Sequence, residues 1–258
     1  MASFLVRFLG ERHAPARSAR KAGRMVRLAL HKIGLDIVPF TPRTEAQTRD
    51  LLLTRVRADL VADVGANKGQ FASMIRQSGY RGEILSLEPM KEAFGVLESL
   101  AAQDPAWRAL QLGAGDASSD AEINIAGNSY SSSLLPMNAS HSNALRDSAY
   151  VGRERIAIRR LDEVMRDLGL SGRRVYLKID TQGFEDRVLR GASGIMQDVH
   201  AIELEASFVG LYDGQLLFDE LHRQVTGAGY YPVHIEPGFA DEMTGELLQV
   251  DVIYIRRH

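Results

Sequence analysis

The sequence predicts an α/β fold built on a mostly parallel, doubly wound sheet. Three observations support this. A short apolar run, Leu60 to Val64, breaks into a glycine turn and continues as a helix, with Phe71, Met74 and Ile75 at helical spacing. Further strand-like apolar runs alternate with helical segments along the chain. Several of these runs end in an acid, at the edge where open α/β sheets bind their ligands.

The composition fits one large α/β domain with an N-terminal extension. The chain has 258 residues, of which 45% are apolar, enough for a packed core. No apolar run approaches the roughly 20 residues of a membrane span. The run from Phe4 to Leu9 is too short for a secretory signal and is interrupted by Arg7. The absence of cysteine excludes disulfides and thiolate catalysis and fits a cytoplasmic protein.

The positive charge is concentrated at the N-terminus. Residues 1–43 hold nine Lys and Arg against two acids, a net +7, which leaves −9 for the remainder of a chain of net charge −2. We predict a basic helical extension over residues 1–44, with a helix from Ala22 to Ile33 that ends at Gly34. This helix fits peripheral contact with an anionic membrane, packing on the domain, or a homodimer contact. The overall charge predicts no nucleic-acid partner.

The domain itself is expected over residues 45–258. A helix over 45–57 leads into the first strand, which is followed by the spacing Asp63-x-Gly65-x-Asn67-x-Gly69. This is not the G-x-G-x-x-G pattern that places a pyrophosphate at a helix N-terminus. An acid before the first glycine suits a cationic ligand group, and the turn resembles the first motif of S-adenosylmethionine (SAM) methyltransferases. A nucleotide-binding or purely structural turn remains the alternative.

The next two strands end in acids. Ile84, Leu85 and Leu87 form a buried strand that ends at Glu88, where a carboxylate can accept both hydroxyl protons of a ribose. A helix over 89–100 and a strand over 107–112 follow. Asp116, after that strand, either accepts an adenine amino group or caps a turn.

A polar segment interrupts the alternation of strands and helices. Between strands expected over 121–125 and 155–160, the stretch from 127 to 143 is dense in hydroxyls and amides. Such side chains can hydrogen-bond a polyhydroxyl acceptor, so we assign substrate binding to Tyr130, Ser131, Ser132 and Ser133. A polar loop without function is the alternative.

The last third of the chain supplies two further acids. After a helix starting at Leu161, a strand over 174–180 ends at Asp180 and leads into a turn and a helix through Leu189. The buried run over 199–205 ends with Glu205, so Asp180 and Glu205 are expected to converge. A helix marked by Leu217, Leu221 and Val225, and strands over 231–235 and 247–255, close the chain as an antiparallel hairpin.

Several segments together resemble the FkbM-type SAM-dependent methyltransferases. They are Asp63–Gly69, Leu87–Pro89, Ser131–Leu135, Leu161–Asp162, Leu177–Glu185, Glu205–Ser207, Leu211–Gln215 and Thr244–Asp251, of which Leu177–Glu185 is the most specific. The resemblance implies a Rossmann-like class I SAM-dependent methyltransferase fold, SAM as cofactor, and O-methylation of a sugar, glycoside or related natural product. It assigns Tyr212 to substrate binding. The cofactor-binding residues it implies are Asp63, Gly65, Asn67, Gly69, Glu88, Asp116 and Asp180.

The chemistry requires a group that removes the proton of the acceptor hydroxyl. The candidates are Asp180, Glu205 and His141, a histidine in the polar loop whose ordinary pKa near ~6.5 suits a general base. Asp180 and Glu205 are alternatively a pair of ligands for Mg²⁺. Glu185 is expected to hydrogen-bond within the turn after Asp180. An NAD-type oxidoreductase and a non-catalytic SAM-binding module are the competing functions, and a glycan or glycolipid is the expected partner.

Overall fold

The computed structural model describes residues 45–128, 130–138, 148–241 and 243–257. The predicted extension over residues 1–44 and the candidate base His141 lie outside these residues. The part described belongs to one compact unit, Arg43–His258.

A seven-stranded sheet organises the fold, with the strand order β3-β2-β1-β7-β8-β10-β9. The strands β3, β2, β1, β7 and β8 run parallel to one another. The strand β10 pairs antiparallel with both β8 and β9. The mostly parallel sheet with a C-terminal antiparallel hairpin is therefore confirmed. The strands are β1 (Leu60–Val64), β2 (Glu83–Leu87), β3 (Trp107–Leu110), β7 (Val175–Ile179), β8 (Val199–Ser207), β9 (Tyr230–Pro237) and β10 (Gln249–Arg256).

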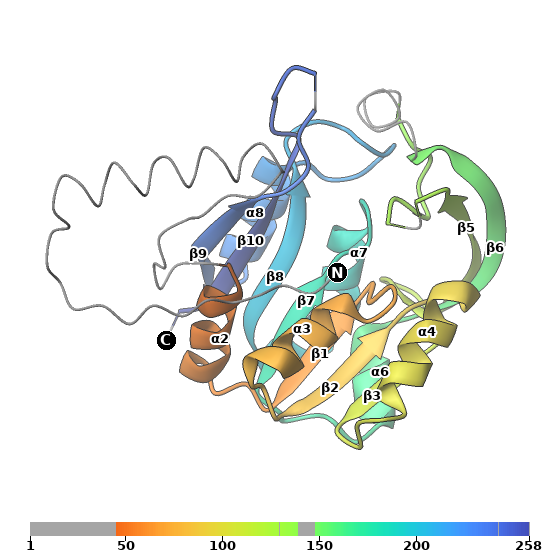
Figure 1. Ribbon diagram of the computed structural model, residues 1–258. Helices are drawn as coiled ribbons and strands as arrows, with labels where there is room; N and C mark the ends of the chain where they lie inside the picture. The colour runs from red at the N-terminus through yellow and green to blue at the C-terminus, as the bar shows by residue number, and fades with distance from the viewer. Residues whose placement is uncertain (1–44, 129, 139–147, 242, 258) are drawn as a thin grey trace, which may run out of the picture. The chain divides into compact units, whose positions relative to one another are not determined.

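Helices cover both faces of this sheet. One face packs against α2 (Glu45–Arg55), α3 (Gln70–Ser78) and α4 (Lys91–Ala101), and α3 and α4 lie in front of the strands in Figure 1. The other face packs against α6 (Leu161–Asp167), α7 (Glu185–Gly191) and α8 (Phe218–Gly227). A 3₁₀ turn, η2 (Ser193–Ile195), follows α7. Because both faces are covered, the central strands are mostly apolar, and the charged residues that they carry, such as Asp63 and Lys178, are paired within the sheet.

The helix after β1 shows how glycines set its limits. α3 begins after Gly69 and ends at Gly79, and both glycines have positive φ, 84° and 115°. The N–H of Gly79 bonds back to the carbonyls of Ile75 and Arg76, which satisfies acceptors that the helix end leaves open. Ala72 and Ile75 face the sheet, so the helical spacing seen in the sequence corresponds to the buried face.

A second, smaller sheet was not foreseen as a separate unit. β4 (Gly113–Ala114), β6 (Tyr150–Arg159) and β5 (Ser119–Ala126) form it in the order β4-β6-β5. The strands expected over 121–125 and 155–160 both exist but are longer. Their apolar residues pack on the start of α4, with Met90 against Ile123 and Ile156 in one cluster. This sheet forms a side wall for the site described next.

Candidate functional site

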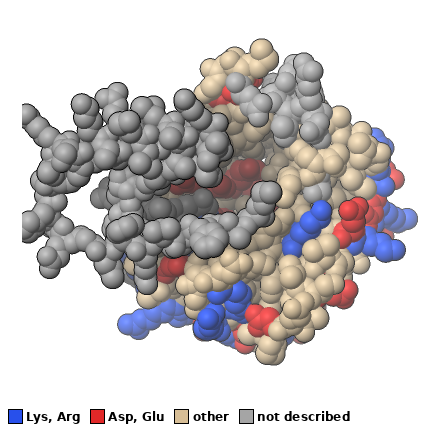
Figure 2. Space-filling view, in the orientation of Figure 1, with Lys and Arg blue, Asp and Glu red and all other residues tan. Residues whose placement is uncertain are grey.

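A cavity opens at the carboxyl ends of β1, β2, β7 and β8. Three carboxylates line it, from Glu88, Asp180 and Glu205, and none of its described lining residues is Lys, Arg or His. Apolar side chains from the small sheet and its surroundings complete the wall: Met90, Leu112, Ile123, Leu134, Ile156 and Phe184. Figure 2 shows acidic side chains in the shaded recess of this face, with Lys and Arg on the outer parts. The cavity therefore combines an apolar wall with an acidic rim.

The glycine turn shapes the floor of the cavity. A Cβ on Gly65, which has φ of 79°, would lie 1.8 Å from the carbonyl oxygen of Asp180. A Cβ on Gly69 would crowd Leu97 and Trp107 at 3.1 Å. The two glycines thus allow β7 and the α4 layer to approach closely. Of the four motif positions, Gly65 and Asn67 line the cavity and Gly69 does not.

Asp63 does not line the cavity but lies buried beneath the turn. Its Oδ2 accepts the Ser86 hydroxyl at 3.3 Å, and its Oδ1 is 3.7 Å from Lys178 Nζ. Burial raises the pKa of Asp63 to about 6, although the Lys178 ammonium opposes the rise. The same ammonium is 3.1 Å from Asp180 Oδ2. Asp63 is therefore absent from the cavity lining, whereas Asp180, which pairs with the same lysine, belongs to it.

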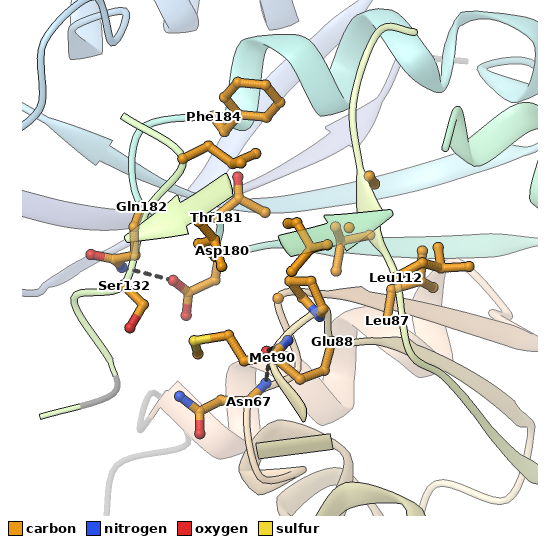
Figure 3. A pocket seen from close by; sticks show the side chains of 18 of the residues that line it. Asn67, Leu87, Glu88, Met90, Leu112, Ser132, Asp180, Thr181, Gln182 and Phe184 are labelled. Carbon is orange, nitrogen blue, oxygen red and sulfur yellow. Dashed lines mark hydrogen bonds between the residues drawn. The ribbon is translucent and has the colours of Figure 1, made fainter. Parts of the chain in front are cut away.

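Glu88 presents a carboxylate that is held in place and still able to accept hydrogen bonds. Its Oε2 accepts the N–H of Asn67 at 2.8 Å, and its Oε1 accepts the N–H of Met90 at 2.8 Å (Figure 3). Each oxygen keeps a second lone pair for a ligand hydroxyl. Burial raises the pKa of Glu88 to about 7, and the two backbone N–H groups oppose the rise. This geometry suits a vicinal diol.

Asp180 and Glu205 converge as the sequence predicted, but through a residue that sequence reasoning missed. Gln182 Nε2 donates to Asp180 Oδ1 at 2.9 Å and to Glu205 Oε2 at 2.8 Å; Figure 3 shows the first of these contacts. Burial raises the pKa of Glu205 well above its ordinary value, and the neighbouring Asp180 carboxylate adds to the rise. A carboxylate with a raised pKa at the wall of a cavity suits proton transfer.

The geometry does not fit the metal site considered from sequence. Among the described residues, no group of three or more His, Asp or Glu side chains is arranged to hold a metal ion. The two carboxylates of the expected pair, Asp180 and Glu205, both accept hydrogen bonds from one amide nitrogen. That N–H₂ group bridges the two carboxylates as a donor, and a donating amide nitrogen is not a metal ligand.

The hydroxyl-rich segment divides into residues that face the cavity and residues that hold the loop. Tyr130, 63% exposed, and Ser132 line the cavity. Ser131 is buried and pairs with Asn128, while Ser133 donates to the carbonyl of Gln182 at 2.6 Å. Of the four residues expected to bind substrate in this segment, only Tyr130 and Ser132 line the cavity.

Two further expected contacts lie away from the cavity lining. Tyr212 is 1% exposed, and its hydroxyl donates to Gln182 Oε1 at 2.8 Å. Asp116 pairs with Arg190 at 3.0 Å, and its backbone carbonyl accepts from Arg160, so it holds a turn next to α7.

Glu185 holds the turn after Asp180, as expected from sequence. Its Oε1 accepts the N–H groups of Thr181 and Gly183 at 3.0 and 3.2 Å, and the Thr181 hydroxyl at 3.2 Å. Burial raises its pKa to about 7.

A buried ion pair lies directly under the site. Arg49 on α2 binds both carboxylate oxygens of Glu203 on β8, and the Tyr176 hydroxyl donates to the same carboxylate. Arg49 and Glu203 are both 3% exposed. Glu203 neighbours Lys178 across the strands, so the pair continues the charged row of Asp63 and Lys178. The signal in the sequence is that Glu203, like Glu205, is an acid in a largely apolar strand.

Comparisons with known proteins identify the family of the chain. The model of the methyltransferase FkbM domain matches residues 63–232, more than half of the chain. A search of curated proteins gives no significant match.

Solved structures with a similar fold include a methyltransferase FkbM from Methylobacillus flagellatus KT. It has 14% sequence identity and a TM-score of 0.47, and covers 76% of this chain; this chain spans only 43% of that one. Magnesium protoporphyrin IX methyltransferase from Synechocystis PCC 6803, solved with bound SAM, has 12% identity and a TM-score of 0.42, with 91% and 97% coverage. A putative O-methyltransferase from Klebsiella pneumoniae has 11% identity and a TM-score of 0.47, with 92% and 90% coverage.

Proposed function

The chain belongs to the methyltransferase FkbM domain family, and from this premise we propose that it is a SAM-dependent O-methyltransferase. Its proposed acceptor is a hydroxyl of a sugar, glycoside or related natural product. The single observation that carries the proposal is that three carboxylates line one cavity: Glu88, whose oxygens each accept one backbone N–H, and the linked pair Asp180 and Glu205 at the ends of other strands.

The residues present fit the proposed cofactor. Glu88 would hold the two ribose hydroxyls, since each of its oxygens has one lone pair left. The apolar wall, including Leu112 and Phe184, would cover the adenine ring. Asp180, next to the glycine turn, carries the negative charge that suits the cationic methionine end. When bound, SAM supplies a methyl group on a positively charged sulfur.

The chain's own residues would position the acceptor and take its proton. A hydroxyl is a weak nucleophile near neutral pH, so its proton must leave as the oxygen–methyl bond forms. Glu205 is the carboxylate suited to receive it, because burial raises its pKa and it borders the cavity. Alignment of the two reactants then supplies most of the acceleration, with roughly 7–11 kcal/mol available from orientation. His141 stays a second candidate for the base.

The charges of the described lining favour an uncharged acceptor. Glu88, Asp180 and Glu205 border the cavity, and no Lys or Arg does so in the part of the chain that the structure describes. A phosphate or carboxylate on the acceptor would find no cationic side chain to pair with in the described lining. The hydroxyls of Tyr130 and Ser132 would instead hydrogen-bond a neutral polyhydroxyl compound.

The remaining expectations stay predictions. Within the described ranges, no helix is both long and apolar enough to cross a bilayer. Cytoplasmic location, peripheral membrane contact through the basic extension and homodimerisation are part of the proposal, with a glycan or glycolipid as the partner. Membership of a methyltransferase family stands against the NAD-type oxidoreductase considered from sequence.

Calorimetric titration of SAM, S-adenosylhomocysteine and NAD into the full chain tests the proposed cofactor. We expect both sulfur compounds to bind, with and without Mg²⁺, and NAD not to bind. Glu88→Gln should weaken this binding, whereas Glu92→Gln on the exposed side of α4 should not. Retention of NAD instead of SAM would contradict the proposal.

A screen of methyl acceptors tests the proposed substrate class. Neutral glycosides and their phosphorylated counterparts would be compared by release of S-adenosylhomocysteine. We expect turnover on neutral members of the panel, and turnover confined to phosphorylated compounds would contradict the charge argument. A protein that binds SAM but turns over no hydroxyl compound would favour the non-catalytic module.

A further inference from the structure

Gln182 occupies an unusual backbone position between the two carboxylates of the site. Its φ is 53°, in the left-handed region that residues other than glycine seldom adopt. Contacts on both sides hold this turn. Ser133 donates its hydroxyl to the Gln182 carbonyl at 2.6 Å, and Glu185 accepts the flanking N–H groups of Thr181 and Gly183. The surrounding structure therefore fixes a conformation that the residue itself does not favour.

The side-chain amide of Gln182 uses its hydrogen-bonding groups on three different elements. Both protons of Nε2 are engaged, one by Asp180 Oδ1 at 2.9 Å and one by Glu205 Oε2 at 2.8 Å. Oε1 accepts the Tyr212 hydroxyl at 2.8 Å. The amide thus links the ends of β7 and β8 to the loop that carries Tyr212.

Tyr212 restrains this amide at its oxygen. A flipped amide would turn Oε1 toward two carboxylate oxygens, so the carboxylates set which way the amide faces, and the Tyr212 hydroxyl, which donates to Oε1 at 2.8 Å, holds it there. Tyr212 cannot move aside, because it is buried with Leu211 and Leu248 in a small apolar cluster. It is further held by a bridge to Met137.

The consequence concerns the two oxygens of Glu205. Oε2 is occupied by the Gln182 amide, whereas Oε1 accepts no hydrogen bond from any described residue. We propose that Gln182 is a positioning residue, restrained by Tyr212, that fixes Glu205 with one oxygen toward the acceptor hydroxyl. The proposal rests on the proposed function, in which Glu205 receives the proton.

Other charged groups face Glu205 from the elements packed around it. Asp180 and Lys178 lie on β7, Asp251 lies opposite on β10, and Glu185 lies at the start of α7. The acids raise the pKa of Glu205 and Lys178 lowers it. Because none of these groups changes in a Tyr212 or Gln182 variant, a change in Glu205 titration would report the loss of the amide contact.

The side-chain amide resonances of Gln182 give a direct test in solution. They are assigned by their loss in Gln182→Asn and followed from pH 5 to 10 in the free full-length protein. We expect them to shift with the titration of Glu205. In Tyr212→Phe the midpoint of this titration should move to higher pH, because the amide no longer stays on the carboxylate and the charged form loses a donor.

A matched control separates this effect from loss of a buried hydroxyl. Tyr230→Phe removes a hydroxyl that donates to the Val199 carbonyl at 2.9 Å and makes no hydrogen bond with Gln182. Its midpoint should equal that of the wild-type protein. Equal midpoints in Tyr212→Phe and Tyr230→Phe, or Gln182 resonances that do not respond to pH, would overturn the proposal.

Gln182→Asn provides a second readout if Tyr212→Phe does not fold. Asn tolerates positive φ but is too short to reach both carboxylates. Glu205 has a folded pKa above its unfolded value, so its contribution to stability is lost as pH rises through the folded pKa. Raising that pKa further extends the loss to higher pH. The melting-temperature deficit of Gln182→Asn should therefore be larger at pH 9 than at pH 5, and an equal deficit would overturn the proposal.

The outcome for the cofactor is independent of these measurements. Tyr212→Phe should still bind S-adenosylhomocysteine, because neither Glu88 nor the glycine turn contacts Tyr212, and any loss of affinity should be confined to the contact of Asp180, which Gln182 also holds. Failure of the wild-type protein to bind it would remove the proposed function and leave the titration result unaffected. With an acceptor from the screen, the pH dependence of kcat should shift in the same direction as the resonance midpoint.

Discussion

Cofactor affinity should depend on pH through Glu88. The free protein holds this carboxyl with a pKa of about 7, raised by burial, whereas a ribose diol requires the ionised form to accept both hydroxyl protons. An acid with this pKa is about 10% ionised at pH 6 and about 90% ionised at pH 8. The affinity for S-adenosylhomocysteine should therefore rise about tenfold over this range, with proton release on binding below pH 7.

Glu88→Gln isolates this contribution from the other titrating groups. Removing an ionised acceptor costs about 1.5–3 kcal/mol, which corresponds to an affinity about 10- to 150-fold weaker at pH 8. The variant should also lose the tenfold dependence on pH, while Asp63, Glu185 and Glu205 titrate as before.

Calorimetry in two buffers of different ionisation enthalpy measures affinity and proton release together.

The stability of the free protein should change with pH in the opposite direction to the affinity. The folded pKa of Glu88 lies above its unfolded value, so its contribution to stability falls as pH rises through 7. If the affinity for S-adenosylhomocysteine depended on pH equally in the wild-type protein and in Glu88→Gln, or if the variant bound it as tightly, the assignment of Glu88 to the ribose would be refuted.

Three further predictions concern the structure around the cavity. Arg49→Met should lower the free energy of unfolding by about 3–5 kcal/mol, since it leaves Glu203 buried without its partner; adding Glu203→Met should recover most of the loss in urea denaturation, and an additive loss would contradict this. Gly65→Ala should destabilise by about 2–5 kcal/mol, because φ of 79° and the Asp180 carbonyl both oppose a Cβ. Gly79→Ala, which also has positive φ but no atom within 4 Å, should cost less in the same assay, and equal costs would argue against the close approach. Chelation of divalent cations should leave the affinity for S-adenosylhomocysteine, measured by calorimetry, unchanged. A large loss of affinity would contradict the conclusion that Asp180 and Glu205 do not hold a metal ion.

The main sheet was predictable because its signals are local. Each central strand is an apolar run flanked by a helix, and the acids at the strand ends mark the edge that binds ligands. Glu88 and Asp180 could be placed at the site on this basis alone. The small sheet was not predictable in the same way, because β5 pairs along β6 and is bridged through Ser133, contacts that local periodicity does not encode.

Asp63 shows where the strand-end argument is insufficient. It precedes the last residue of β1, and its register opposite Lys178 directs its carboxylate under the turn. The sequence places an acid near the strand end but does not show whether the side chain faces a ligand or a neighbouring strand. The partner, Lys178, lies 115 positions later in the chain numbering, so its role was not visible.

Gln182 was missed for a similar reason. Glutamine carries no signal for positive φ, and its role depends on Tyr212, on a separate loop. The link between Arg49 and Glu203 likewise joins residues 154 positions apart. Functional groups that act by contact across the fold are thus hidden from sequence patterns, whereas groups defined by their position on one strand are not.

A crystal structure of the full chain with S-adenosylhomocysteine would show whether the cavity holds the cofactor. We expect the two ribose hydroxyls within hydrogen-bonding distance of Glu88, the adenine ring against Leu112 and Phe184, and the sulfur directed toward Asp180 and Glu205. A ligand bound elsewhere, or bound in the cavity with its ribose away from Glu88, would contradict it.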